Sequence, residues 1–346
     1  MKSSWSIAIS FLIYSIVLLA LPADSPSGQE SAIGIVDFYG LCNVSEQKVR
    51  QALEIKEGDA LPKSMKEVQR RLENLTDVEQ ARLNVACCEA GQIILYVGIR
   101  EKGSPSLRFR AAPNGAIRLP ENIVQAGEDF QDVFGEAVQK GVLREDDSQG
   151  HALFDGPKLR AIQARYLTFA TRDLKLLRTV LHESSDARHR AVAAQIIAYH
   201  ANKRDILKDL VYGMKDPDEG VRNNSMRALE VLAVFAKSSP TQRIKIPVEP
   251  FIDMLNSIEW TDRNKSSLAL YRLTERRDPS ILASLRHRAL PSLVEMARWK
   301  STGHALPSFT LLGRIGNLSE AEIKKTWETG NRESLIKTIL ERYRSK

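Results

Sequence analysis

The stretch from Lys215 to Ala236 constrains the fold more than any other part of the sequence. It reads KDPDEGVRNNSMRALEVLAVFA, an acidic turn followed by a helix with Val221, Ala228 and Leu232 on one side. Burying one Leu or Ile contributes about 1.5–3 kcal/mol, whereas ordering each residue costs roughly 1–2 kcal/mol in backbone entropy. One such helix therefore cannot stand alone, and the sequence predicts neighbours of the same kind.

Related patterns occur on both sides of this stretch. When Arg222 is taken as a reference, equivalent positions fall at Arg190, Arg263 and Ala305, at intervals of 32, 41 and 42 residues. Such intervals are typical of repeated helical units. The fourth copy contains Pro307, which predicts a late start or a kink in its helix. Each copy is preceded by another amphipathic stretch, at residues 173–181, 205–214, 248–258 and 288–299, and residues 319–346 are predicted to cap the array.

The second copy resembles the HEAT-repeat family. Its DPDEGVRNNSMRAL is close to the family pattern D-x-x-x-V-R-x-x-A-x-x-A-L. The resemblance implies that residues 157–346 form an all-α right-handed superhelix that binds proteins through extended surfaces. In HEAT repeats, acidic turns and arginines usually cap helices and pair between repeats. Asp216, Asp218 and Arg222 are therefore interpreted as structural residues and not as a site.

A row of residues beside the core positions is a candidate partner-binding surface. Tyr199, Val231, Arg272 and Arg314 occupy the same place in the four copies. Stacked helices would bring them into one row, and aromatic and arginine side chains suit protein contact. The alternative is a solvated flank without a role in binding.

The N-terminal part has a different pattern. Alternating and helical periodicities predict the order strand, helix, helix, strand, strand. The expected elements are Ile33–Tyr39, Glu46–Glu54, Pro62–Leu75, Val78–Ala86 and Gln92–Arg100. Gly98 lies inside the last strand and predicts a bulge there.

Residues 31–102 resemble the POTRA domain, the polypeptide-transport-associated module. The matching positions are Phe38 and Gly40 in the first strand, Gly58 after the first helix, Val78, Ala81 and Leu83 in the second strand, and Tyr96, Val97, Ile99 and Glu101 in the last. The resemblance implies an α+β module with the order β-α-α-β-β. A three-stranded sheet has open edges, so Ala81, Leu83 and Val85 are candidates for pairing with an extended peptide. The alternative is an edge covered by residues 103–116.

Residues 103–156 are predicted to connect the two domains and to contain a helix near Pro120–Lys140. Ahead of both domains, Lys2 is followed by an apolar run, Ile7–Leu21, and by small residues. This is the pattern of a secretory signal peptide, residues 1–23, cleaved after Ala23. It predicts a bacterial protein in the periplasm or secreted. An uncleaved inner-membrane anchor is the alternative, although the run is short for a span.

Export permits disulfide bonds. The cysteines are Cys42, Cys87 and Cys88. A bridge from Cys42 to Cys87 or Cys88 is one prediction, and three buried free cysteines are the alternative.

The composition narrows the function. The net charge is +7 and the pI is about 9.2, yet no run of five basic residues occurs. Export further argues against nucleic acid as a ligand. No catalytic motif, metal-ligand spacing or cofactor motif is present in the sequence. We therefore expect an exported protein–protein adaptor rather than an enzyme, binding one partner by the sheet edge and another by the helical surface. An active site in the helical groove, between Tyr199, His200, Arg272 and Arg314, is the alternative.

Overall fold

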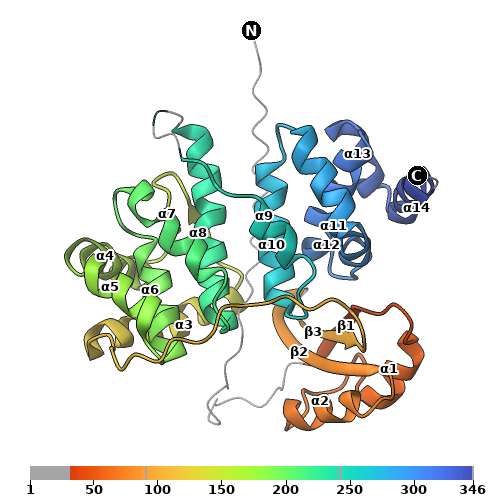
Figure 1. Cartoon of the computed structure of the whole chain (residues 1–346), viewed down its shortest axis with the longest axis horizontal. Coiled ribbons are helices and arrows are strands. Elements are labelled where there is room, and N and C mark those ends of the chain that lie inside the picture. Colours follow the sequence, from red (N-terminus) through yellow and green to blue (C-terminus); the bar gives the residue numbers. More distant parts are fainter. Residues whose placement is uncertain (1–31, 90–91, 240, 242–243, 345–346) are drawn as a thin grey trace.

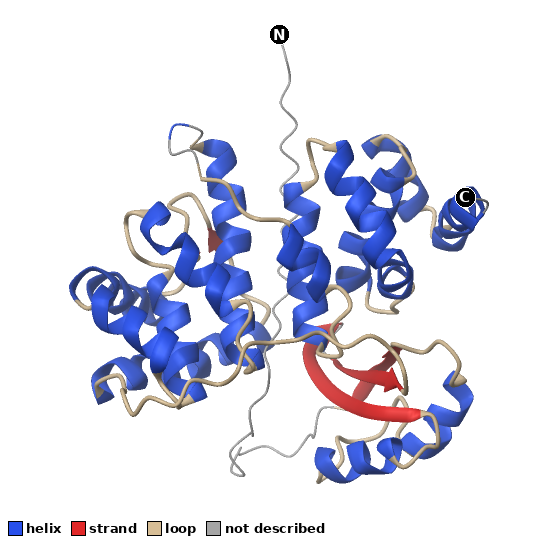
Figure 2. Ribbon diagram, viewed as in Figure 1, coloured by secondary structure: helices blue, strands red, loops and turns tan. Residues whose placement is uncertain are grey.

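The computed structural model describes residues 32–89, 92–239, 241 and 244–344. The predicted signal peptide lies outside these residues. The described chain is mostly helical, with a small mixed sheet near its N-terminal end (Figures 1 and 2). In Figure 1 the sheet lies beneath the central helices of the body.

The sheet domain has the predicted order of elements. Strands β1 (Ile33–Tyr39), β2 (Val78–Glu89) and β3 (Gln92–Glu101) form a sheet in the order β1-β3-β2, with β1 parallel and β2 antiparallel to the central β3. Helix α1 (Glu46–Leu53) begins where Ser45 accepts a hydrogen bond from the Lys48 amide. Helix α2 (Met65–Glu73) begins later than predicted, because Ser64 and not Pro62 precedes its first turn as the N-cap.

The two faces of the sheet belong to two different cores. Val36, Leu95 and Val97 pack with α1 and α2 on one face. On the other face, Tyr39, Ile94 and Tyr96 join the core of the helical body. Alternate residues of each strand point to opposite faces, so the same strands serve both cores. The sheet domain is thus packed against the helices and is not a tethered module.

Aromatic residues form much of the contact between the sheet and the helices. The ring of Tyr96 stacks on Trp260 with centroids 4.7 Å apart, and its hydroxyl lies 2.6 Å from Nδ1 of His304. Tyr39 donates a hydrogen bond to the Ile258 carbonyl at 2.7 Å.

Gly98 is explained by this contact. A β-carbon there would lie 2.7 Å from the Ile258 carbonyl oxygen and 2.6 Å from the Tyr39 ring. The register on both sides of Gly98 is regular. The predicted bulge is therefore wrong, and the glycine is required by the close approach of the helical body.

The connector crosses from the sheet to the helices as an extended strap (Figure 1). The Arg110 amide donates to the Lys215 carbonyl at 2.9 Å, and the Gly115 amide donates to the Glu183 carbonyl at 2.8 Å. Among the described residues, no backbone bond joins residues 103–116 to β2. The predicted helix is confirmed as α3 (Glu121–Gln139) and is followed by a short hairpin of β4 (Glu145–Asp146) and β5 (Leu153–Phe154).

The helical body continues to the end of the described chain. Its long helices pack in succession, α6 on α8, α8 on α10 and α10 on α12. Helix α12 starts five residues before Pro307, so the predicted late start is wrong; α13 and α14 pack against it. The helices are α4 (Pro157–Arg172), α5 (Leu174–Glu183), α6 (Ala187–Ile197), α7 (Lys203–Gly213), α8 (Glu219–Ser238), α9 (Glu249–Met254), α10 (Trp260–Leu273), α11 (Pro279–Ala297), α12 (Thr302–Ile315), α13 (Glu320–Glu328) and α14 (Arg332–Arg344).

A ladder of arginines joins successive helices. Arg190, Arg222 and Arg263 each donate to a carbonyl six residues earlier in the chain, in the turn that precedes their own helix. Each also binds a carboxylate from the following part of the body. The acceptors are Asp216, Asp262 and Glu295 respectively. The regular offset shows that these arginines hold consecutive turns and helices together, as the sequence predicted for Arg222.

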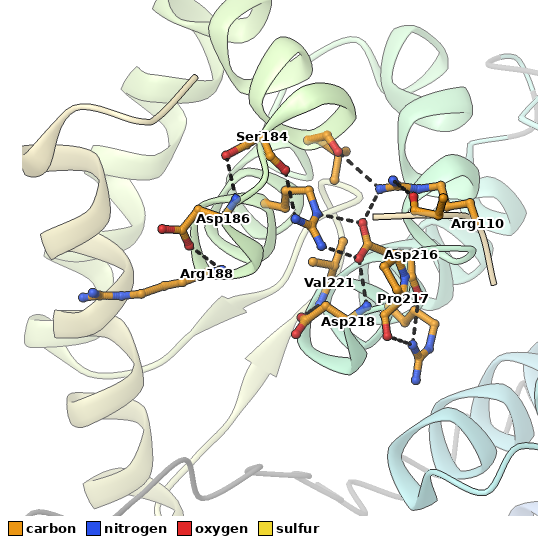
Figure 3. A network of polar contacts seen from close by, with 12 residues as sticks. Arg110, Ser184, Asp186, Arg188, Asp216, Pro217, Asp218 and Val221 are labelled. Carbon is orange, nitrogen blue, oxygen red and sulfur yellow. Dashed lines mark hydrogen bonds and ion pairs between the residues drawn. The ribbon is translucent and has the colours of Figure 1, made fainter. Parts of the chain in front are cut away.

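Asp216 is the most connected carboxylate of the ladder (Figure 3). It is fully buried and accepts hydrogen bonds from Arg190, from Arg110 of the connector and from the Asp218 amide. Because its oxygens are already engaged within the fold, we assign Asp216 a structural role.

Candidate functional site

The candidate site is a cavity of about 110 Å³, partly open to solvent, in the helical body. It lies between α3 and the segment after it on one side, and α6, α8 and α10 on the other. Five separate stretches of sequence therefore contribute to its walls.

One wall is aromatic. Phe130 and Phe134 are four residues apart, which places them on the same side of α3. Their rings stack with centroids 5.4 Å apart. Phe154 of β5 meets the Phe134 ring edge to face at 5.1 Å. All three line the cavity, which gives it an apolar surface.

The turn before β5 brings His151 into the opposite wall. Gly150 has a φ of 73°, and a β-carbon there would lie 2.9 Å from Phe235 and 3.0 Å from Cε of Lys203. This tight packing puts His151 beside Lys203, whose Nζ donates to the His151 Nδ1 and to the Ala198 carbonyl, both at 2.9 Å.

His151 is neutral at pH 7 and has one unpaired nitrogen. Burial and the charge of Lys203 lower its pKa to about 4, and burial lowers the pKa of Lys203 to about 7. With Nδ1 accepting from Lys203, the proton of the ring is on Nε2. Nε2 is buried and has no hydrogen-bond partner among the described residues. His151 thus holds a buried donor that has no partner in the described chain.

Arg227 also lines the cavity, but its charge is compensated. It forms ion pairs with Glu145 of β4 and Glu230 of α8. Nearby, burial and the charge of Glu145 raise the pKa of Asp147 to about 8, so Asp147 is protonated at pH 7. The two glutamates carry one more negative charge than Arg227 balances, and this charge acts on the neighbouring Lys265.

Lys265 is different. It lies on α10, is 5% exposed and lines the cavity. Within the described part of the chain it has no hydrogen-bond or ion-pair partner, whereas a buried lysine is normally paired. Burial and the charge of Arg227 lower its pKa to about 8, so it is still mostly protonated at pH 7. On α8, Oδ1 of Asn223 is a buried acceptor that also lacks a partner in the described chain.

The predicted row of four residues is divided by the structure. Tyr199 and Val231 line the cavity, at 5% and 1% exposure. Arg314 is 3% exposed and binds Glu320 of α13 and the Tyr271 carbonyl. Arg272 lies over the ring of Tyr271. The row as an exposed surface is therefore wrong, because three of its members are buried between helices.

The residues proposed for an active site do not converge either. Tyr199 bonds to Gln163 and Ala152, and His200 to the Ala170 carbonyl, whereas Arg272 and Arg314 lie at the ends of α10 and α12. The described residues hold no group of three or more potential metal ligands.

The edge of β2 is partly blocked. The Ala81 amide donates to Glu73 Oε1 at 3.0 Å, and its carbonyl accepts from Arg82 Nη1 at 2.9 Å. Ala81 is therefore unavailable for strand pairing. In an antiparallel strand the backbone N–H and C=O groups of every second residue point to the same side. Those of Leu83 and Val85 therefore point outward, as those of Ala81 do. The side chains of Leu83 and Val85 pack toward α1 and α2. Only this shorter part of the predicted edge is a candidate.

The predicted bridge from Cys42 is wrong. Cys42 is an exposed free thiol, and Cys87 is disulfide-bonded. The alternative of three free buried cysteines is wrong for the same reason.

The sequence patterns did not predict a site at Lys265 or His151. One signal for Lys265 was available: it lies two residues after Arg263, where the two preceding copies have Val192 and Asn224. A charged residue on a helix that the repeat pattern buries points to a special environment. His151 is near Lys203 only through the fold.

Comparison of the chain with known families and with curated proteins finds no match. None of the helices in the described residues is long and apolar enough to cross a membrane.

Proposed function

We propose that this chain is an exported adaptor that binds a partner polypeptide in the cavity of its helical body. The proposal combines a secretory leader, a POTRA-like sheet domain and a HEAT-like array of helices. All three features are predictions from sequence patterns, and we include them in the proposal as such.

The main observation that supports the proposed adaptor function is the cavity. Three phenylalanines form one wall, and Lys265, which has no hydrogen-bond or ion-pair partner in the described chain, lies on another. Leaving a buried polar atom unpaired costs about 1–3 kcal/mol. A ligand group that pairs with Lys265 would remove this cost, so the arrangement favours binding.

The size of the cavity favours part of a larger partner. Sites for drug-sized molecules or cofactors usually enclose roughly 300–1,000 Å³, whereas this one is about 110 Å³. A cavity of about 150 Å³ accommodates a benzene ring. The present cavity is smaller than that, so one small side chain of a polypeptide matches the space better than a complete cofactor does.

Packing of the sheet domain supports the adaptor role. Tyr39 and Tyr96 hold the sheet against α10 and α12. The β2 edge at Leu83 and Val85 is therefore carried at a fixed position relative to the cavity. Two surfaces held in this way suit simultaneous contact with one extended partner or with two.

Site-specific photocrosslinking tests the proposal. A benzoylphenylalanine at Gln131, which lines the cavity, is compared with one at Asp132, its exposed neighbour on α3. We expect position 131, and not 132, to give one adduct of defined mass in envelope extracts, which mass spectrometry identifies. Ala228→Leu, which fills the cavity from α8, should abolish the adduct. Equal labelling at both positions would argue against a partner in the cavity.

Export is tested separately. N-terminal sequencing of the protein from the envelope fraction should begin at Asp24. A chain that retains Met1 and sediments with the inner membrane would favour the anchored alternative.

A further inference from the structure

Lys265 and Gln195 bring accessible polar groups without partners to the cavity. Nζ of Lys265 retains accessible surface and has no hydrogen-bond or ion-pair partner in the described chain. The same is true of the side-chain amide of Gln195 on α6, which also lines the cavity. Lys265 offers only N–H donors, whereas Gln195 offers a carbonyl oxygen and an N–H group. A ligand group that satisfies both must accept from the first and is able to donate to the second.

The other polar side chains of the lining are less suited to a ligand. Tyr199 and Asn224 form hydrogen bonds within the helical body. Nε2 of His151 and Oδ1 of Asn223 are fully enclosed, so a ligand does not reach them. Gln131 is exposed and is able to bond to water instead. Recognition of a ligand by hydrogen bonds therefore depends mainly on the ammonium group of α10 and the amide of α6.

The charges at the cavity sum to zero. Arg227 and Lys265 are the charged residues of the lining. Glu145 and Glu230 lie beside them and carry an equal negative charge. A ligand group with a net charge of either sign would therefore be buried without a counter-charge, which is unfavourable. The group that suits this cavity is polar and neutral.

The aromatic wall favours a planar group. Phe130, Phe134 and Phe154 present ring surfaces to the cavity. A carboxamide is flat, so its face packs on such rings while its edge forms hydrogen bonds. Its oxygen and its nitrogen are separate atoms, one for each of the two polar groups, whereas a hydroxyl has a single atom for both. A carboxamide is therefore the neutral group that fits the lining best.

We propose that the cavity binds the side-chain carboxamide of an asparagine in the partner polypeptide, with its oxygen at Lys265 and its N–H group at the oxygen of Gln195. Asparagine is the smaller of the two residues with this group, in keeping with a cavity of about 110 Å³. This inference rests on the proposed function and specifies which side chain enters the cavity. Free acetamide and the acetamido group of a sugar share this chemistry, so the experiment includes both.

Binding of matched peptides to the full chain tests the inference. The peptides are Gly-Ser-Ala-X-Ala-Ser-Gly with asparagine, aspartate or leucine at X, three side chains of nearly the same shape. Acetamide and N-acetylglucosamine are the further probes, and ligand-observed NMR titration measures weak dissociation constants. We expect the asparagine peptide to bind at least about tenfold more tightly than the leucine peptide, because its oxygen accepts from a charged donor. It should bind at least about threefold more tightly than the aspartate peptide, because the cavity has no counter-charge for an additional carboxylate.

Variants locate the effect. Lys265→Met should bind the asparagine and leucine peptides equally, whereas Lys208→Met, at an exposed position on α7, should retain the preference. Gln195→Leu should reduce the preference, and Gln125→Leu, at an exposed position on α3, should not. Circular dichroism verifies that the variants are folded, and the comparison of the three peptides with the unmodified protein requires no variant.

Three results would overturn the inference. They are equal binding of the asparagine and leucine peptides by the unmodified protein, tighter binding of the aspartate peptide, and an unchanged preference in Lys265→Met. Tighter binding of acetamide or of N-acetylglucosamine than of the asparagine peptide would overturn recognition of a polypeptide side chain.

The two proposals fail separately. If the crosslink at position 131 persists while the asparagine and leucine peptides bind equally, the cavity binds a partner but not through a carboxamide. If the asparagine preference is found without any crosslinked partner, the chemistry of the cavity stands and the adaptor function is wrong.

Discussion

Arg190 donates from Nε and from Nη2 to the two carboxylate oxygens of Asp216, each at 2.9 Å. The arginine comes from α6 and the aspartate, labelled in Figure 3, from the turn before α8, so the pair joins consecutive units of the body. Arg222 repeats the relationship with Asp262. At these positions the successive units are joined by buried ion pairs and not only by apolar side chains.

Asp216→Asn is expected to lower the free energy of unfolding by about 3–5 kcal/mol, because it leaves Arg190 and Arg110 buried without their counter-charge. Urea denaturation followed by circular dichroism measures the change. Asp218→Asn is the matched control. Asp218 caps α8 by accepting from the Val221 amide, and asparagine caps nearly as well, so its loss should stay below about 1 kcal/mol. Similar losses in both variants would contradict the assigned role of Asp216.

Gly98→Ala is expected to destabilise the contact between the sheet and the helical body. Its β-carbon would collide with the Ile258 backbone, and relieving such overpacking typically costs about 1–3 kcal/mol. Hydrogen exchange should increase along β3, and the fluorescence of the buried Trp260 and Trp299 should shift to longer wavelength. In Gly220→Ala, near the start of α8, the nearest atom to the new β-carbon is Oδ1 of Asp218 at 3.2 Å, so this control should leave the contact between the sheet and the helical body unchanged. A tight, unchanged interface in Gly98→Ala would refute the explanation.

His304→Gln is expected to reduce the loss of stability at acid pH. Burial lowers the pKa of His304 to about 3, so the unfolded chain takes up the proton first as the pH falls below about 6.5. Folding stability therefore falls over this range, by roughly 2 kcal/mol at pH 5 for this residue. Asp37, whose pKa burial raises to about 6, acts in the opposite direction, but it does so in both proteins. Urea unfolding at pH 7 and pH 5 measures the difference, and His287→Gln, at an exposed position, is the control. The same pH dependence in all three proteins would disprove the assignment.

Lys265→Met is expected to stabilise the protein at pH 7, by up to about 3 kcal/mol, because it removes an ammonium group whose charged form burial disfavours. The folded-state pKa of about 8 lies below the unfolded value of 10.5. The cost is therefore fully present below pH 8 and disappears as the pH rises toward 10.5. Thermal unfolding at pH 7 and pH 10 should show a larger gain at pH 7. A loss of stability at pH 7 would mean that Lys265 is paired within the fold.

Local patterns in the sequence predicted the elements of the fold well. The strand Ile33–Tyr39 was predicted to the residue, and Ser45 was identified as the start of α1. Both depend on neighbours along the chain, namely an alternating apolar pattern and a side chain that caps its own helix. The structural interpretation of Arg222 followed from the repeat pattern, and its bonds to Asp216 and Asp262 agree with it.

Predictions that depended on contacts between residues far apart in the sequence were less accurate. Gly98 was interpreted from its own strand, but the residue that requires a glycine there is Ile258, from the helical body. The row of Tyr199, Val231, Arg272 and Arg314 was predicted from their equal offset in the four copies of the pattern. Helix packing then buried Val231 and Arg314, since equal spacing says nothing about which side faces solvent.

The sequence by itself determined the two kinds of structure, their order and the residues that begin and pair the helices, because these follow from periodicity and from contacts between neighbours in the chain. Only the tertiary structure decided that the sheet packs on the helices and that Lys265 lines a cavity with His151 and Phe130. Lys265 is more than a hundred positions away from His151 and from Phe130 in the sequence. The chemistry of each residue depends on which groups surround it in the fold. Only the fold removes Lys265 from water and places it near Arg227, Glu145 and Glu230, and these surroundings set the pKa of its side chain.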